Sequence, residues 1–509
     1  MPGAATQAPR WLRLAALPAA LLASLPLVYL LVRTLGAGGE QIWDILWRGR
    51  TAALLLRSLA LAAVVTAASL VIGLSWAWLA TRTTLPARRT WLVLGALPLA
   101  VPSYLAAYAW VSLVPTLPPF LGSVLVLTLV CYPYVLLPVA AALTRADPAA
   151  EDVARSLGKG SVAVLLTVTL RQVRPAAVAG GLLVALYVLS DFGAVALLRL
   201  DTFTRVIYTS YRAGFDPVPA AVLSLLLVAT TAVIAALELR SRGRARQARL
   251  GSGVARAATR VRLSPLATGV SLAGLGTLVV LALGVPLGTV VWWLGGSSTG
   301  LPWADVLPAT ATTVGLALAA AALTLLVAAP VGMLAARYPS RSTAWLERLS
   351  YVGYALPGIV VGLSLVYLGV RVVYPLYQTT TLLLVAYVVL FLPMAVGSIR
   401  ASVSATPPVL EEMARSLGRS PLRAFTSVTL PVIAPGVLAG AALVSVSVMK
   451  ELPATLILRP TGTETLATEL WSATAAGAYG AAAPYAAALV LVAIVPAGIL
   501  AARTGVGGR

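Results

Sequence analysis

The sequence predicts an all-α polytopic membrane protein, with about twelve transmembrane helices arranged in two parallel homologous halves. Three observations support this prediction. The chain has 509 residues, 60% of them hydrophobic and only 10% charged, whereas a soluble domain has about 25% charged residues. Apolar runs of about 20 residues, enough to cross a bilayer, recur along the chain. A polar decamer between two such runs occurs at 151–160 and again at 411–420.

Twelve apolar runs are the candidate spans, six in each half. In the first half they lie near residues 13–33, 57–80, 91–115, 121–143, 177–199 and 218–239. In the second half they lie near 265–293, 309–335, 350–372, 380–399, 435–458 and 482–502. The first run reads as a retained span rather than a signal peptide, because it is longer than a usual signal h-region.

The third run of each half is interrupted by proline or glycine, in ALPLAVPSYLAAYAW and ALPGIVVGLSLVYL. Such an interruption is typical of a simple kink or of a helix that lines a transport pathway. Tyr104, Tyr108 and Tyr367 lie in these runs and are candidate pathway residues, although membrane tyrosines also mark interfaces.

The charge distribution predicts the orientation of the chain. The net charge is +21, and the basic residues gather in alternate loops, which places both termini in the cytoplasm. The segment 240–262 has eight arginines and no acid, as in a solvated linker or a surface that contacts anionic lipid. Nucleic acid is not an expected partner, because the basic residues are scattered over many short loops. The absence of histidine removes histidine-based catalysis.

The offset of 260 residues extends beyond the decamer. Segments 151–180 and 411–440 share twelve identities in thirty positions. Because six spans is an even number, both halves enter the membrane the same way up and form a parallel repeat. We therefore divide the chain into a first half (1–240), an arginine-rich linker (241–263) and a second half (264–509), with polar loops at 147–176 and 406–436.

Each polar loop predicts a short helix, a turn and a second helix. Asp147 and Thr406 are candidate N-caps, each followed by proline. Gly158 and Gly418 stand where the short helix should end, because glycine tolerates the left-handed conformation after a helix. Loops of about thirty residues greatly exceed the usual connection of about 4–6 residues. A duplicated docking surface explains them better than a plain connector.

The pattern E-[DE]-x-A-x-x-x-G, followed by a hydrophobic stretch, resembles the coupling loop by which ABC-importer permeases contact their ATPase. The matching residues are Glu151, Asp152, Ala154, Arg155 and Gly158 in the first copy, and Glu411, Glu412, Ala414, Arg415 and Gly418 in the second. The first copy departs from the pattern where Arg171 replaces the proline present in the second copy as Pro431. The resemblance implies a type I importer permease in a bacterial inner membrane.

The same resemblance implies the partners. They are two copies of a cytoplasmic ATPase, one for each loop, and an extracytoplasmic solute-binding protein, with one permease chain per complex. The stretch LGKGS at 157–161 lacks the first glycine and the hydroxyl residue of a phosphate-binding loop. ATP and magnesium are therefore expected on the partner ATPase, with no cofactor and no enzymatic activity on this chain.

The segments SDFGAVALLRLDTFTRVIYTSYRAGFD (190–216) and MKELPATLILRPTGTETLATELW (449–471) resemble permeases of ferric-iron ABC importers of the fused, two-half type. This implies ferric iron as cargo, with thiamine, 2-aminoethylphosphonate or polyamine, carried by close relatives, as alternatives. An ion-coupled secondary transporter is a more distant alternative, since it would need no docking loops.

Asp191 and Glu451 occupy matching positions in the fifth and eleventh runs, about 20 Å from the start of each span. Because a charge inside a span is costly, both are candidates for the translocation pathway, together with Lys450. The alternative is structural: Lys450 neutralises Glu451, and Asp191 bonds a neighbouring helix. No metal ligands are assigned.

Overall fold

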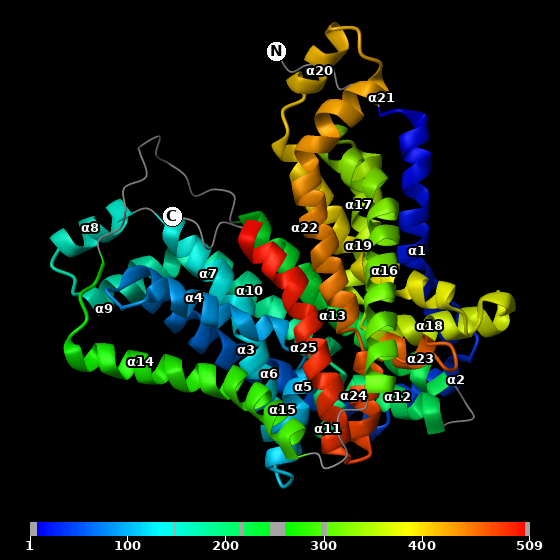
Figure 1. Cartoon of the computed structure of the whole chain (residues 1–509), viewed down its shortest axis with the longest axis horizontal. Coiled ribbons are helices and arrows are strands. Elements are labelled where there is room, and N and C mark those ends of the chain that lie inside the picture. Colours follow the sequence, from blue (N-terminus) through cyan, green and yellow to red (C-terminus); the bar gives the residue numbers. More distant parts are fainter. Residues whose placement is uncertain (1–7, 147, 214–217, 245–259, 297–302, 504–509) are drawn as a thin grey trace. The chain divides into compact units, whose positions relative to one another are not determined.

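The computed structural model describes residues 8–146, 148–213, 218–244, 260–296 and 303–503, and within these ranges it contains helices and no strand (Figure 1). Among the described residues, nine helices are long and apolar enough to cross a membrane, and ten if one bent pair counts as a span. Two shorter apolar helices, Gly358–Arg371 and Tyr479–Ile494, fall in the remaining predicted runs. The all-α polytopic prediction is confirmed.

The helices of the first half follow the apolar runs with short connections. They are α1 (Arg10–Leu35), α2 (Gly39–Leu46), α3 (Gly49–Arg82), α4 (Arg88–Ala96), η1 (Leu97–Ala100), α5 (Ser103–Leu113), α6 (Pro119–Cys131) and α7 (Pro133–Arg145). There follow α8 (Pro148–Ser156), α9 (Ser161–Val164), the π-helical turn η2 (Leu165–Thr169), α10 (Leu170–Ser190), α11 (Gly193–Leu197), α12 (Phe203–Ala213) and α13 (Val218–Arg244).

The second half repeats this order. It contains α14 (Pro265–Val279), η4 (Val280–Gly284), α15 (Val285–Gly296), α16 (Trp303–Arg337), α17 (Arg341–Ser350), η5 (Val352–Ala355), α18 (Gly358–Arg371), η6 (Tyr374–Leu376) and α19 (Thr380–Ala405). It ends with α20 (Val409–Ser416), α21 (Pro421–Ala424), the π-helical turn η7 (Phe425–Thr429), α22 (Leu430–Met449), α23 (Pro453–Leu458), α24 (Leu466–Ala475) and α25 (Tyr479–Arg503).

The third span of the first half is broken, as its prolines predicted. The helical pieces Arg88–Ala100 and Ser103–Leu113 meet at an angle of 90°. Pro102 lies at this break with an extended backbone, because proline has no N–H to continue the hydrogen-bond ladder. In the second half, Pro357 occupies the same place between η5 and α18.

The chain forms two compact units, which we name after their central helices. The α3 unit comprises Asp44–Thr209 and Leu226–Gly296, and the α16 unit comprises Met1–Trp43, Ser210–Leu225 and Ser297–Arg509. Helix α1 packs in the α16 unit against α16, α17, α18 and α19, whereas α14 and α15 pack in the α3 unit against α4 and α5. The first span of each sequence half therefore packs in the compact unit that is built mainly from the other half. Most of the predicted linker, 245–259, lies outside the described residues.

Both cores depend on small residues at helix crossings. In the α3 unit, α3 and α10 both pack against α7. A Cβ atom added at Gly73 would lie 2.7 Å from the Cβ of Val135, and one at Gly180 would lie 2.7 Å from the carbonyl oxygen of Tyr134. Such close approach allows backbone packing where the lipid supplies no hydrophobic driving force. These crossings hold the helices that carry the polar loops.

Candidate functional site

The two polar loops fold into the same helix–turn–helix, each at one end of its own unit, where Figure 1 labels α8 with α9 and α20 with α21. Gly158 has a φ of +80° and Gly418 a φ of +83°, which confirms the prediction that glycine ends each short helix. The Gly158 N–H donates to the carbonyl oxygen of Arg155 at 3.0 Å, and the Gly418 N–H donates to that of Arg415 at 3.0 Å.

The start of the second short helix differs from the prediction. Helix α20 begins at Val409 with Pro408 at the N-cap position. The hydroxyl of Thr406 donates to the carbonyl oxygen of Ser402 at 3.1 Å, so this buried residue ends α19 and does not cap α20. The other candidate cap, Asp147, lies outside the described residues.

The predicted coupling residues of the two polar loops divide between an inner and an outer face. Ala154, Ala414 and Glu151 are buried, and Arg155 and Glu411 are half-buried. The exposed residues are Gly158, Gly418, Asp152, Glu412 and Arg415. Apolar side chains also lie on the exposed face: Val153 and Leu157 in the first loop, and Met413 and Leu417 in the second. Exposed apolar side chains gathered on short polar helices are typical of a protein-interaction surface.

A π-helical turn lies within each polar loop, after its helix–turn–helix, and directs a threonine toward the loop's glutamate. The Thr169 hydroxyl, at the end of η2, donates to Glu151 Oε1 at 2.9 Å. The Thr429 hydroxyl, at the end of η7, donates to Glu411 Oε2 at 3.0 Å. One extra residue in a helical turn rotates the following side chains, and such turns are frequent at functional sites. The sequence analysis missed both threonines, although VTL recurs at 168–170 and 428–430.

An ion pair distinguishes the first loop from the second. Arg82, the last residue of α3, lies with its Nη2 3.4 Å from Glu151 Oε1, and Arg155 Nη2 lies 3.4 Å from Glu151 Oε2. Arg337 ends α16 as Arg82 ends α3, yet within the described ranges Glu411 forms no ion pair. The backbone after Arg82 also bonds the end of the linker, since the Val261 N–H donates to the Arg82 carbonyl oxygen at 2.8 Å.

Asp191 lies in a break between two helices. The fifth run was predicted as one span, 177–199, but α10 ends at Ser190 and α11 begins at Gly193. The Ser103 hydroxyl donates to Asp191 Oδ1, and the backbone N–H groups of Ala194 and Val195 donate to Oδ2 at 3.0 and 3.4 Å. The buried carboxylate therefore satisfies the first N–H groups of α11, which have no partner inside the helix.

Glu451 makes the same arrangement in the α16 unit. The predicted span 435–458 is broken after Met449, and α23 begins at Pro453. The Ala454 N–H donates to Glu451 Oε1 at 2.9 Å, and the Thr455 N–H and hydroxyl donate to Oε2 at 3.0 and 2.6 Å. Lys450 is half-buried beside it. Among the described residues, no cluster of three or more cysteine, aspartate or glutamate side chains could hold a metal ion.

The three tyrosines lie in different surroundings. Tyr104 and Tyr108 are buried in α5, and Gly193 allows α11 to approach Tyr104, since an added Cβ would lie 2.7 Å from the tyrosine Cβ. In the α16 unit, the ring of Tyr367 stacks on that of Tyr29 with centroids 6.1 Å apart and meets the ring of Tyr211 edge-on at 6.5 Å. A pathway role for these tyrosines stays a prediction.

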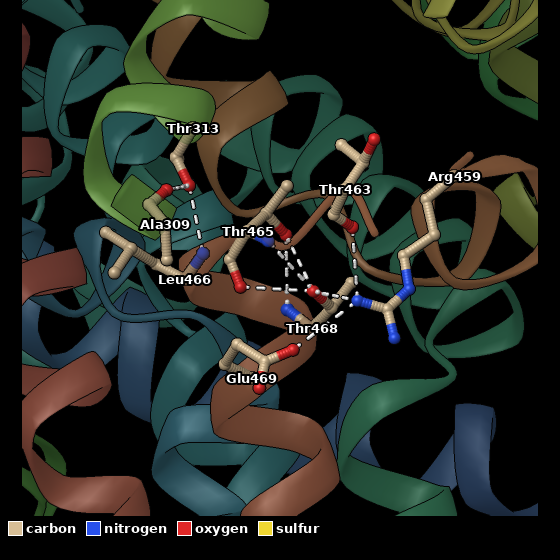
Figure 2. A network of polar contacts seen from close by, with 8 residues as sticks. All are labelled: Ala309, Thr313, Arg459, Thr463, Thr465, Leu466, Thr468 and Glu469. Atoms are coloured by element: carbon tan, nitrogen blue, oxygen red, sulfur yellow. Dashed lines mark hydrogen bonds and ion pairs between the residues drawn. The ribbon is translucent and has the colours of Figure 1, made fainter. Parts of the chain in front are cut away.

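A polar network fixes the loop between α23 and α24 at the end of α22 remote from α20 (Figures 1 and 2). Arg459 Nη1 donates to the Thr463 carbonyl oxygen at 3.2 Å and to the Thr468 hydroxyl at 3.1 Å, and it pairs with Glu469 at 3.4 Å. The Leu466 N–H donates to the Thr313 hydroxyl of α16 at 2.9 Å. Burial raises the pKa of Glu469, and the nearby charge of Glu464 adds to this effect.

The α3 unit repeats one of these contacts. There the Phe203 N–H, at the start of α12, donates to the Ser58 hydroxyl of α3 at 3.3 Å. A hydroxyl on the long helix α3 or α16 thus holds the start of α12 or α24, the second helix after the break in each half. The sequence analysis missed this pair because its partners lie far apart along the chain.

Two homologous sets of broken spans, each carrying one polar helix–turn–helix, define the permease subunit of an ABC importer. Residues 328–502 match the family described as binding-protein-dependent transport system inner membrane component. The chain is 35% identical over 496 residues to the Fe(3+)-transport system permease protein FbpB 2 of Haemophilus influenzae, covering 97% of this chain and 98% of that one. It therefore belongs to the family of ferric-iron ABC permeases, which are multi-pass proteins of the inner membrane.

Two partial matches lie in related permeases. A putative 2-aminoethylphosphonate transport system permease protein, PhnV, of Salmonella typhimurium is 31% identical over 160 residues, or 31% of this chain and 59% of that one. The molybdate/tungstate transport system permease protein WtpB of Pyrococcus abyssi is 30% identical over 142 residues, or 28% of this chain and 56% of that one. Permeases of this kind work with an ATPase and a binding protein.

Proposed function

We propose that this chain is the transmembrane subunit of an importer that carries ferric iron, delivered by an extracytoplasmic binding protein. The observation that supports this cargo is the 35% identity to an Fe(3+)-transport permease along nearly the whole of both chains. Partial matches to permeases for other solutes cover at most 40% of this chain. They therefore carry less weight for the cargo than for the architecture.

The mechanism that we propose is alternating access driven by ATP on a partner. One permease chain assembles with two ATPase copies, because each half presents one coupling loop. ATP and magnesium bind the ATPase, and this chain binds no cofactor. Closure of the ATPase pair presses on α8 and α20, and the connected helices α10 and α22 transmit the movement. The loops and both termini lie in the cytoplasm, as the distribution of basic residues predicts.

The partial match to a 2-aminoethylphosphonate permease supports 2-aminoethylphosphonate as a second candidate cargo. Thiamine or polyamine would fit the same architecture. A secondary transporter driven by protons or sodium would need no ATPase, and its transport would continue when the partner's ATP hydrolysis is blocked.

Uptake of radioactive ferric iron tests the proposal. Cells that lack this chain are compared with cells that carry it again, each with and without excess thiamine or 2-aminoethylphosphonate. We expect iron uptake that requires the chain, ignores both competitors and stops when the partner ATPase cannot hydrolyse ATP. Unchanged iron uptake in the deleted cells would overturn the cargo. Uptake that persists without ATP hydrolysis would overturn the mechanism.

A further inference from the structure

Two adjoining cavities lie beside the first coupling loop, within the α3 unit. The first has a volume of about 510 Å³, and the second about 480 Å³. Leu74 of α3 and Leu170 of α10 line both cavities, so the two adjoin at these side chains, and we name them together the groove. The groove is lined by Leu166, Thr167, Arg171, Arg174 and Ala177 in its first part, and mainly by apolar side chains of α3, α7 and α10, with Trp78, in its second part.

The first part of the groove is strongly basic. Arg171 and Arg174 lie three residues apart on α10, hence on one face of the helix, and within the described part of the chain neither forms an ion pair. A third cation approaches from the loop, because Lys159 Nζ lies 3.5 Å from the Thr167 hydroxyl. Two guanidinium groups and an ammonium group are the kind of charged donors that hold a phosphate group.

The length of α10 places the groove near the expected depth of lipid headgroups. Arg174 is 16 residues before the end of α10 at Ser190, or about 24 Å at about 1.5 Å per residue. The hydrocarbon core is about 30 Å thick, so both arginines lie near its boundary on the side of the coupling loop. Leu166 is exposed beside them, and Trp78 lies in the apolar part, as is common for tryptophan at a membrane interface.

We propose that this groove binds an anionic phospholipid, with the headgroup phosphate held by Arg171, Arg174 and Lys159 and an acyl chain lying along Leu74 and Leu170. The basic charge selects an anionic lipid over a zwitterionic one, and the apolar lining selects a lipid over a soluble anion. The assignment of this face to the cytoplasm rests on the proposed function, but the binding site itself does not.

The site belongs to the first half alone. At the offset of 260 residues, Pro431 and Ala434 replace Arg171 and Arg174. Thr169 lines the groove and also donates to Glu151, so a bound lipid braces the junction between α8 and α10. The departure of the first loop from the family pattern at Arg171 thus has a physical role.

Native mass spectrometry of the purified full-length chain tests the site. Phosphatidylglycerol and phosphatidylcholine are titrated separately, and we expect one phosphatidylglycerol per chain to bind preferentially. The double variant R171Q/R174Q should weaken this binding about thirtyfold, because each basic residue contributes about 1 kcal/mol and about 1.4 kcal/mol corresponds to tenfold. The control R419Q/R423Q removes the same charge from the second loop and should bind as wild type does.

A second variant separates lipid binding from misfolding. Leu74→Trp fills the apolar part of the groove and leaves every charge in place, so it should also lose the preferential lipid. Circular dichroism and gel filtration show whether each variant is folded. Three results would overturn the proposal: no preference for phosphatidylglycerol in wild type, equal loss in the R419Q/R423Q control, or full displacement of the lipid by millimolar inorganic phosphate. None of these readouts involves transport, so they are independent of the cargo.

Discussion

Arg82 at the end of α3 and Glu151 of the first polar loop form an ion pair with 3.4 Å between Nη2 and Oε1, and their side chains are only 5% and 4% exposed. The pair joins residues 69 positions apart and fixes α8 to a long transmembrane helix. In the described part of the second half, Glu411 is held by the Thr429 hydroxyl alone. The two loops share a shape but differ in how firmly they are attached.

The first prediction concerns this ion pair. E151Q leaves the Arg82 charge buried without this partner, which costs about 3–5 kcal/mol. R82Q should cost less, because Glu151 keeps Arg155 and the Thr169 hydroxyl as partners. We expect R82Q and E151Q to lower the midpoint of thermal unfolding in detergent and to uncouple ATP hydrolysis from uptake in the assembled transporter. Both effects should be larger than those of E411Q, which weakens a single hydroxyl contact worth about 1 kcal/mol.

The double variant R82M/E151L tests whether charge or attachment matters. It removes both charges and keeps an apolar contact, so its stability should exceed that of either single variant. If R82Q unfolds at the same temperature as wild type, the ion pair does not hold α8 to α3.

The second prediction concerns Gly158 and Gly418. Both have positive φ, and an added Cβ would meet nothing within 4 Å. The expected effect of a side chain is thus backbone strain of about 1–2 kcal/mol, without a clash in the isolated chain. We expect the double variant G158V/G418V to insert into the membrane at normal levels but to lose uptake, because both coupling turns open.

Asparagine is the matched control, since it tolerates the left-handed conformation better than valine. The variant G158N/G418N should retain most of the uptake. Normal uptake by the inserted valine variant would refute the coupling role. Equal loss in both variants would show that the ATPase needs the space beside each glycine rather than its backbone conformation.

The sequence predicts local features of this molecule well and long-range ones poorly. Composition and the offset of 260 residues suffice for the helical class, the spans, the two loops and the turns at Gly158 and Gly418. Nothing local marks Arg82 as the partner of Glu151, because their contact depends on how α3 and α8 pack. The exchange of α1 between compact units is equally invisible, since any apolar helix can pack on either core.

The breaks before Asp191 and Glu451 escaped prediction for a different reason. Hydropathy stays high across both positions, so a 20-residue window predicts a single unbroken span in each half. In each break the carboxylate accepts hydrogen bonds from the first N–H groups of α11 or α23 and so stabilises the start of a new helix. An acid followed within two or three residues by glycine or proline is the signal that could have marked these breaks.

The third prediction concerns the pH dependence of the network in Figure 2. Burial raises the folded-state pKa of Glu469 above its usual value. A raised carboxyl pKa means that the folded chain holds this proton more tightly than the unfolded chain. Folding stability from this group is therefore present at low pH and falls as pH rises through the folded-state pKa. Relative to E469Q, wild type should lose thermal stability as pH rises from about 4, near the usual glutamate pKa, through the raised folded-state pKa.

The comparison with E469Q at each pH removes the titration of every other group. The variant D201N, in the other unit, provides a control for an exposed acid that also pairs with an arginine. If the difference between wild type and E469Q is constant across this range, or grows in favour of wild type as pH rises, the pairing with Arg459 outweighs burial.

The last prediction separates the two roles open to Asp191 and Glu451. Their oxygen atoms already accept hydrogen bonds from the first N–H groups of α11 and α23, so both residues act as helix caps in this structure. Asparagine and glutamine keep one acceptor oxygen in place, whereas alanine keeps none. We expect D191N and E451Q to retain insertion and most iron uptake. D191A and E451A should each lose about 0.5–2 kcal/mol of stability, the usual cost of a missing cap.

A cargo role makes the opposite prediction. Ferric ion prefers anionic oxygen ligands, so an amide at either position would abolish uptake while leaving the unfolding midpoint unchanged. Uptake and thermal unfolding should therefore be measured on the same preparations. Loss of uptake in D191N at wild-type stability would place this carboxylate on the path of the cargo. Parallel loss of both properties, restricted to the alanine variants, identifies the carboxylates as the groups that hold the broken spans in shape.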